Sequence, residues 1–321
     1  MTLYRAVLSS QSPLASPLDV VMQSDTLFGA FCWSWLRRFG TGSLEAELIT
    51  PSLAGEPPVI FSNGFPHDTL PVPLGCRDLD KNFENIADKE NRRKAYQEGK
   101  KIKKARYVKL DSFQRIRRGD WRGFTDSLLS GFGKTQTTLH NTVSRESGTV
   151  ERTDDTAGLF GLDRQYFDNG QLFDCYLLSS LPVDVLHPVL DLMCSLGIGA
   201  DKSAGCGVFR LESLSTAEEL TLAPNGANGV VMLSNFLPAK TNPVDGWYQV
   251  LPKYPKLDRE LAAGDTPFKK PVLFMKAGAL FRTDTPKVWY GRCVSRVAAL
   301  DLSVMINGCA IALSMRIPEE A

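Results

Sequence analysis

The sequence lacks an apolar run of about 18 or more residues, and its opening residues have neither the basic start nor the apolar core of a secretory signal. Both absences argue against a membrane or secreted protein, so we expect a cytoplasmic protein without a membrane partner. The seven cysteines include no C-x-x-C pair and no zinc-knuckle spacing. We therefore expect buried free thiols, no metal site and no cofactor.

Histidine is also scarce, since the chain contains only three. RNA cleavage without a metal needs a general acid and a general base close to a 2′-hydroxyl. His140, in the sequence neighbourhood of Lys134 and Tyr166, is the one plausible base, because His187 falls inside a helical pattern and His67 lies in a proline-rich stretch. We expect a protein that is not an enzyme, with an endoribonuclease as the alternative.

The net charge of +1 hides an uneven distribution. Residues 89–118 hold thirteen Lys and Arg against three acidic residues, a surplus of ten positive charges that leaves −9 for the remainder. This asymmetry indicates a surface for a polyanion and an acidic body that could dock on proteins, although a solvated loop is an alternative. Aromatic residues that could stack on bases lie within or beside the run, at Tyr96, Tyr107, Phe113 and Trp121. The central cations of this basic arm are Lys101, Lys103, Lys104 and Arg106.

A glycine-rich segment, L-G-I-G-A-D-K-S-A-G-C-G-V-F, occupies residues 196–209 directly after an apolar helical pattern. Glycines allow close backbone approach, so the segment could form a phosphate cradle to which Lys202 adds charge and Ser203 a hydroxyl. A dinucleotide fingerprint is excluded because its third glycine would fall on Lys202, and a P-loop ending at Gly133 is excluded because Leu128 replaces its first glycine. A helix C-cap followed by a plain turn remains the alternative.

The hydrophobic pattern predicts an α+β fold. A strand at residues 2–8 precedes a helix with Ser24 as N-cap that stops before Gly40, and a helix at 185–196 precedes the glycine-rich segment and a strand at 208–214. This order fits a ferredoxin-like domain interrupted by a basic insertion at 76–121. Further strands of a smaller second unit are expected at 230–236, 271–281 and 310–317.

Four motifs in this order carry a resemblance to a known family. They are S-D-T-L-F-G-A-F-C-W at 24–33, the P-x-P run at 71–73 leading into K-I-K-K-A-R-Y-V at 101–108, H-N-T-V-S-R-E-S-G at 140–148, and G-I-G-A-D-K-S-A-G-C-G at 197–207. Together they cover about the first 210 residues, and M-K-A-G-A-L-F at 275–281 agrees more loosely. The chain resembles the RAMP (RRM-like) subunits of type III CRISPR interference complexes, and within them the fourth Csm subunits of type III-A complexes.

The resemblance implies tandem ferredoxin-like (RRM-like) domains, at 1–215 and 216–321, with a β-hairpin thumb at 140–167 in the first. It further implies a non-catalytic subunit that caps the 5′ handle of the guide RNA (crRNA) and meets target RNA indirectly. Its protein partners would be the large polymerase-like signalling subunit and the repeated backbone RAMP subunit of the antiviral complex.

The resemblance also implies a set of RNA contacts. Handle phosphates would be held by Gly199, Lys202, Ser203 and Gly205, with a second anion site at a helix N-terminus formed by Ser24 and Thr26. In the thumb, the implied RNA contacts are His140, Asn141, Arg145 and Arg152, and the implied wedge at a base step is Leu159 or Phe160. An ordinary hairpin with paired surface charges is the alternative for the thumb.

Two other functions stay open from the sequence. One is an endoribonuclease that processes guide-RNA precursors on the same ferredoxin-like plan, with His140 as its base. The other is a scaffold that contacts only proteins through its acidic remainder and leaves the basic arm solvated.

Overall fold

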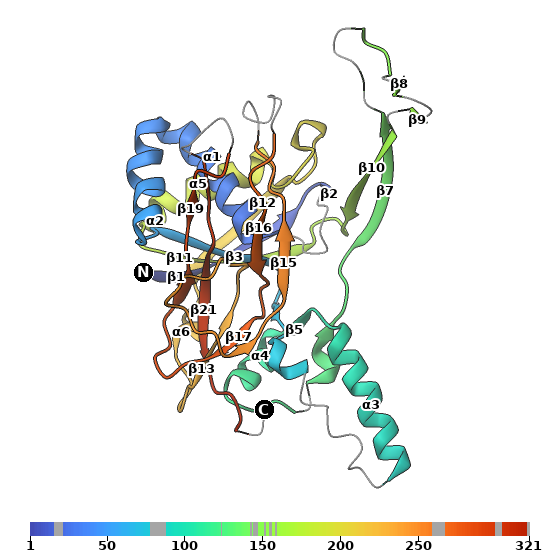
Figure 1. Cartoon of the computed structure of the whole chain (residues 1–321), viewed down its shortest axis with the longest axis vertical. Helices are drawn as coiled ribbons and strands as arrows, with labels where there is room; N and C mark the ends of the chain where they lie inside the picture. Colours follow the sequence, from blue (N-terminus) through green and yellow to red (C-terminus); the bar gives the residue numbers. More distant parts are fainter. Residues whose placement is uncertain are drawn as a thin grey trace.

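The computed structural model describes residues 1–15, 22–77, 88–122, 124–141, 143, 147–150, 152–153, 156–157, 159–258, 267–298 and 304–319. A body of sheets and helices carries two projections, a long hairpin at one end and a helix at the other (Figure 1). No helix within the described residues is long and apolar enough to cross a membrane.

A four-stranded antiparallel sheet with two helices forms the first half of the body. Its elements, in chain order, are β1 (Thr2–Ser10), α1 (Ser24–Ser43), β3 (Val59–Pro66), β11 (Leu172–Ser179), α5 (Val183–Leu196) and β12 (Phe209–Thr216). The strands lie in the order β12-β1-β11-β3, and every pair is antiparallel. This βαββαβ order is the one that the sequence predicts for the ferredoxin-like part.

Apolar spacing explains how the two helices cover one face of this sheet. In α1, Leu27, Phe31 and Trp35 recur every four residues and are fully buried. Gly40, with φ +83°, interrupts the helix where the sequence predicts its end, before η1 (Leu44–Ile49) and α2 (Thr50–Ala54). Helix α5 buries Leu186, Val189, Leu190 and Met193 in the same core.

The second half of the body is a five-stranded sheet that packs on the other face of the first. Its order is β14 (Gly246–Trp247), β17 (Leu280–Arg282), β13 (Gly229–Met232), β21 (Cys309–Met315) and β18 (Trp289–Gly291). Side chains from both sheets, including Leu3, Tyr176, Val231 and Leu313, share one core. The α+β class is confirmed, but no helix follows Thr221 among the described residues, so the tandem ferredoxin-like arrangement and its boundary at 215 stay predictions.

Short elements complete the body. They are α6 (Glu218–Thr221), the pair β15 (Val250–Lys253) and β16 (Val272–Met275), and the pair β19 (Val294–Ser295) and β20 (Met305–Ile306). All seven cysteines are free thiols, and five of them are buried.

The basic insertion is more than an excursion from the fold. It contains η2 (Leu74–Arg77), α3 (Lys89–Lys104), β5 (Tyr107–Lys109) and α4 (Leu110–Arg117), and β5 pairs between β4 (Thr69–Pro71) and β6 (Leu128–Leu129), which follows η4 (Thr125–Ser127). Tyr107, Phe113 and Trp121 are buried in the core between the sheets, so the expectation that they stack on bases is wrong. Only Tyr96 of the four aromatics is exposed.

The projecting hairpin consists of β7 (Lys134–Asn141) and β10 (Leu159–Tyr166), paired along their whole length. It starts at Lys134, earlier than the expected thumb boundary at 140. The strand β2 (Leu14–Ala15) joins the other edge of β10, and β8 (Arg152–Thr153) pairs with β9 (Thr156–Ala157) beyond the hairpin strands. The hairpin is therefore anchored to the body through β2.

Candidate nucleic-acid interface

The glycine-rich segment forms a compact loop between α5 and β12. Gly197, Gly199, Gly205 and Gly207 all have φ between +74° and +93°, which side-chain-bearing residues rarely adopt. At Gly207 a Cβ would lie 1.9 Å from the carbonyl oxygen of Ile198, so only glycine fits. The glycines are thus explained by the turn itself.

The loop directs most of its amides inward. The amide of Ile198 donates to the carbonyl oxygen of Gly207 at 2.8 Å, that of Gly207 donates to Pro13 at 2.7 Å, and that of Gly205 donates to Lys202 at 3.0 Å. The expectation that the Gly205 amide is available to a phosphate is therefore wrong for this conformation. Gly199 makes no such internal bond among the described residues.

The exposed tip of the loop is polar and carries one cation. The short helix η5 (Lys202–Ala204) places Ser203 on the surface, whereas the Lys202 ammonium forms an ion pair with Asp258. A phosphate at Lys202 must compete with this carboxylate. Lys202 keeps 17% of its side chain exposed, so it can change partner at the surface.

An ion pair connects the loop to the base of the hairpin. Arg164 of β10 donates to the carboxylate of Asp201 at 2.7 Å, and this hydrogen bond raises the pKa of the guanidinium. The amide of Ala200 also donates to Ala15 of β2, which pairs with β10. The loop, β2 and the hairpin thus form one continuous surface. Sequence reasoning missed Arg164 and Asp201, because residues 37 positions apart give no local signal.

Apolar and aromatic side chains lie near the far end of the hairpin. Leu159 and Phe160 are 57% and 50% exposed, and the His140 ring stacks on Phe160 with centroids 5.6 Å apart. Leu139, which sequence reasoning missed, is 74% exposed. A side chain that wedges between bases must be apolar and exposed, and Leu159 and Phe160 meet both conditions.

The expected RNA-contact residues near this end differ in what the structure describes. Asn141 is exposed and pairs with Leu159. Arg152 lies in β8, and its side chain is outside the description. Arg145 lies outside the described residues.

His140 is not assembled with its expected catalytic neighbours. Lys134 and Tyr166 face each other at the base of the hairpin, whereas His140 pairs with Phe160 six residues along the strand. That separation is about 20 Å at the rise of a β-strand. The His140 imidazole contacts the Thr138 hydroxyl at 3.0 Å. These residues do not form an acid–base site in this conformation.

The N-cap expectation at Ser24 is wrong. The helix begins at Ser24, Gln23 is its N-cap, and no side chain caps it. The Ser24 amide is not available to a surface anion because it donates to the side-chain oxygen of Asn63, and the buried Ser24 hydroxyl donates to the carbonyl oxygen of Asn235. Thr26 is half-buried in the same turn. The second anion site is therefore not formed as expected.

The basic arm lies at the end of the body opposite the hairpin (Figure 1). Lys101, Lys103 and Lys104 are exposed on the last turn of α3, and Arg106 is half-buried between α3 and β5. The structure does not bring these residues together with the glycine-rich loop or with the hairpin end.

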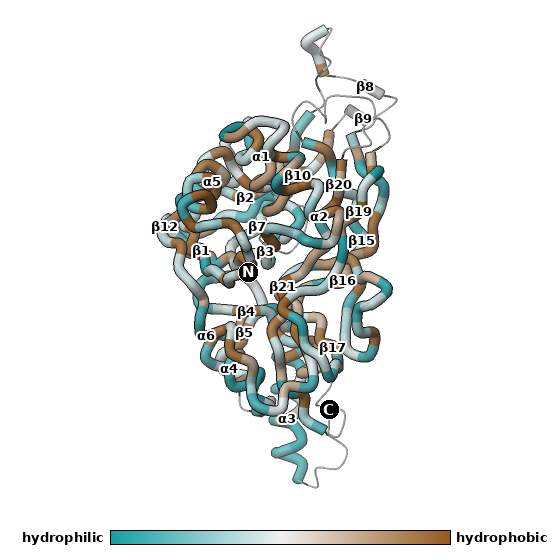
Figure 2. The backbone as a smooth tube through the Cα atoms, turned by 90° about the vertical axis from the view of Figure 1, so that its left-hand side faces the viewer, coloured by the Kyte–Doolittle hydropathy of each residue, from teal (hydrophilic) through white to brown (hydrophobic). Residues whose placement is uncertain are grey.

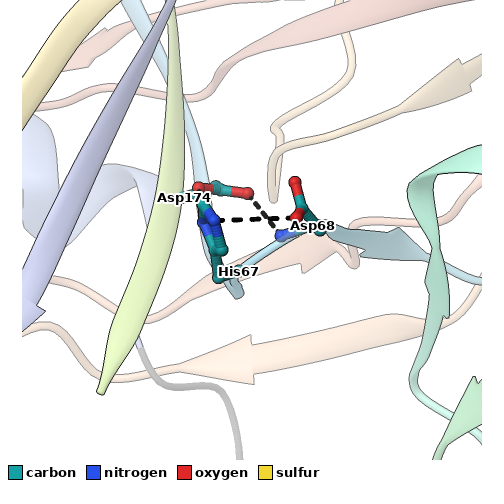
Figure 3. A group of neighbouring side chains, drawn as sticks. All are labelled: His67, Asp68 and Asp174. Atoms are coloured by element: carbon teal, nitrogen blue, oxygen red, sulfur yellow. Dashed lines mark hydrogen bonds and ion pairs between the residues drawn. The ribbon is translucent and has the colours of Figure 1, made fainter. Parts of the chain in front are cut away.

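His67, Asp68 and Asp174 form a separate cluster beside the first sheet (Figure 3). Each offers one ligand atom, and these atoms lie within 4.8 Å of one another. However, Arg5 donates to Asp68 at 2.5 Å and to the buried Asp174 at 2.7 Å, so a guanidinium already supplies the positive charge. Arg5 also lowers the pKa of Asp68. The cluster is best described as an ion-pair network that ties the turn after β3 to β1 and β11.

Solved structures share this fold along nearly the whole chain. A chain of the Csm1-Csm4 cassette crystallised with cA3 is 20% identical, with a TM-score of 0.58 and 99% of each chain covered. A chain of the same cassette with AMPPNP is 21% identical, with a TM-score of 0.59 and 99% of each chain covered. No family model and no curated protein matches the sequence.

A third structure names a different pair of proteins. A chain of the Csm3-Csm4 subcomplex in the type III-A CRISPR-Cas interference complex is 12% identical, with a TM-score of 0.60 and coverage of 98% of this chain and 100% of that one. Csm4 is the component that all three complexes contain. The expected fold of a Csm RAMP subunit is therefore confirmed. At sequence identities of 12–21%, the similarity shows the fold alone.

Proposed function

We propose that this chain is a Csm4-like, non-catalytic subunit of a type III-A CRISPR complex and that it binds the 5′ handle of the guide RNA. The observation that carries the proposal is the join between the glycine-rich loop and the hairpin, through Arg164, Asp201 and β2. In this fold, the join presents a polar loop tip and an exposed aromatic strand on one surface. A single-stranded RNA needs both, for its phosphates and for its bases.

In this proposal the loop tip holds the handle backbone. Ser203 donates its hydroxyl to a phosphate, and Lys202 exchanges Asp258 for the phosphate, which offers more acceptor oxygens. Phe160, supported by the stacked His140 ring, contacts a splayed base beyond the handle. The hairpin positions the RNA and supplies apolar surface. This set of residues does not include a general acid paired with a general base.

The protein partners follow from the same fold. The similar chains come from complexes that contain Csm1 or Csm3, so we infer a large subunit and a repeated backbone subunit as partners here. The two-unit organisation at 1–215 and 216–321 belongs to the same proposal.

A binding experiment with the purified full chain tests the proposal. A guide RNA with its 5′ handle and a length-matched RNA without it are titrated across a salt series while the RNA is checked for cleavage. We expect handle-dependent binding of intact RNA, and Lys202→Ala should weaken it and reduce its salt dependence. Cleavage at one position would contradict the non-catalytic assignment, and equal affinity for both RNAs would contradict the handle assignment.

A further inference from the structure

Helix α3 projects from the body, and among the described residues its buried positions lie in its last turns (Figure 1). Gly99 and Ile102 are its buried residues, and Ala95 is half-buried one turn earlier on the same side. The N-terminal turns carry only exposed charged or polar side chains and Tyr96. Figure 2 accordingly shows the projecting part of α3 as hydrophilic. Packing in the body does not explain why these turns form a helix with these side chains.

The cations of α3 are concentrated on one side. At 3.6 residues per turn, seven neighbouring positions of the helical surface hold six cations, one aromatic residue and no acid. We name this set the α3 stripe: Lys89, Arg92, Arg93, Tyr96, Lys100, Lys103 and Lys104. The two acids, Glu90 and Glu98, fall outside it together with Lys94 and Lys101. Within the described residues, Lys89, Arg93, Lys103 and Lys104 form no ion pair with a carboxylate, whereas Lys94 pairs with Glu90 at 3.3 Å.

The chemistry of the α3 stripe favours a phosphate backbone over a protein surface. Protein interfaces are depleted of lysine and have an apolar core, but Tyr96 is the one large apolar side chain here, and the Lys100 ammonium lies 4.4 Å from its ring centroid. From Lys89 to Lys104 the helix rises about 22 Å, the length of roughly six nucleotides along one strand of a duplex. Repeated charge without shape or apolar surface suits a repeating polyanion.

We infer that the α3 stripe is a second nucleic-acid site, which binds the sugar–phosphate backbone without reading bases. It lies at the opposite end of the body from the hairpin (Figure 1), so it does not depend on the proposed handle site. The basic arm expected from the sequence is thereby divided, because Lys103 and Lys104 belong to the stripe and Lys101 does not.

Two matched double variants of the full chain test the inference. Arg93→Gln/Lys100→Gln removes two charges from the stripe, and Lys94→Gln/Lys101→Gln removes two charges from the rest of the same helix. Glutamine has nearly the helix propensity of lysine and arginine, so helix content should be unchanged, as circular dichroism would check. Affinity is measured by fluorescence anisotropy over a salt series with handle-free single-stranded RNA, an RNA duplex and a DNA duplex of equal length.

The stripe variant should bind more weakly, with a slope of log affinity against log salt that is shallower by about 1.4 to 1.8. The control variant should keep the original slope. The probe that shows the largest difference identifies the source of the backbone. Equal losses in both variants, or binding to none of the probes, would overturn the inference.

The two sites can fail separately. If Lys202→Ala leaves both the affinity for the handle RNA and its salt slope unchanged while the stripe variant shows the shallower slope, the assignment of the handle phosphates to the loop is wrong and the inference stands. If Lys202→Ala weakens binding of the handle RNA but the two helix variants behave alike, the inference is wrong and the handle proposal stands.

Discussion

The hairpin and helix α3 both project from the body, but they differ in how they are held and in the side chains that they expose. The hairpin is held by pairing between residues far apart in sequence and ends in apolar and aromatic groups such as Leu159 and Phe160. Helix α3 is local in sequence and presents mainly charged side chains over most of its length. One projection can recognise shape and stacking, whereas the other can recognise only charge. In the two proposals above, the hairpin accordingly contacts bases and α3 contacts only a sugar–phosphate backbone.

The largest effect should come from the loop that anchors the hairpin. In Gly207→Ala the new Cβ would lie 1.9 Å from the carbonyl oxygen of Ile198 at a residue with φ +74°. In the control Gly205→Ala the φ is +81°, but no atom lies within 4 Å. We expect the control to lose about 1–2 kcal/mol of unfolding free energy, from backbone strain alone.

Gly207→Ala should lose more than that control, because backbone must move, and it should also lose handle binding. Urea unfolding and RNA titration measure both quantities. The α3 stripe should keep its salt-dependent binding in any variant that still folds. Equal stability of the two variants would show that the loop has another conformation.

The features that could be predicted from the sequence are those with a local signal. The surplus of charge at 89–118 and the periodicity of Leu27, Phe31 and Trp35 are local signals, so the arm and the first helix could be predicted. The pairing of Arg164 with Asp201 could not, because it depends on strand register. Burial of Tyr107, Phe113 and Trp121 was missed for a similar reason, since the core that covers them combines strands of both sheets that are not adjacent in the sequence.

The glycine-rich loop shows the same limit on a smaller scale. Its glycines correctly predict a tight turn with positive φ. The direction of its amides depends on Pro13 and Ala15, which accept two of them from another part of the chain. A cradle therefore could not be distinguished from a closed turn by the motif alone.

Phe160→Ala should give the next largest effect, and it sharpens the contrast between shape and charge. Base–aromatic stacking contributes about 1–3 kcal/mol to binding, and Phe160 is 50% exposed, so its loss should hardly change stability. We expect weaker binding of the guide RNA at every salt concentration, with an unchanged salt slope. The stripe variant should differ, because its slope of log affinity against log salt becomes shallower. A changed slope in Phe160→Ala would contradict a role in stacking.

Arg164→Ala should loosen the hairpin without touching α3. The guanidinium joins β10 to Asp201 at 2.7 Å, so its removal leaves the pairing with β2 and the packing of Phe132 and Phe167 on Phe173 to hold the base. Amide hydrogen exchange should become several-fold faster in β7 and β10 and stay unchanged in α3. Arg164→Lys, which keeps the charge but not the planar geometry, should give an intermediate result. Unchanged exchange in the alanine variant would show that the hairpin is anchored without Arg164.

The smallest effect is expected on acidification, and it should affect the body rather than either projection. Arg5 lowers the pKa of Asp68 below its ordinary value of 3.8. The stabilisation from this pair is therefore present above about pH 4 and is lost as the pH falls through the lower folded-state pKa. Because Asp68 is 62% exposed, solvent screening keeps the contribution small.

Asp68→Asn is a matched variant for this measurement, because asparagine tolerates the φ of +56° found at this turn. At pH 7 it should be slightly less stable than the unchanged chain in urea, and the two should converge as the pH falls below about 4. Parallel stability curves for the two chains would show that the Arg5–Asp68 pair contributes nothing to the pH dependence of stability.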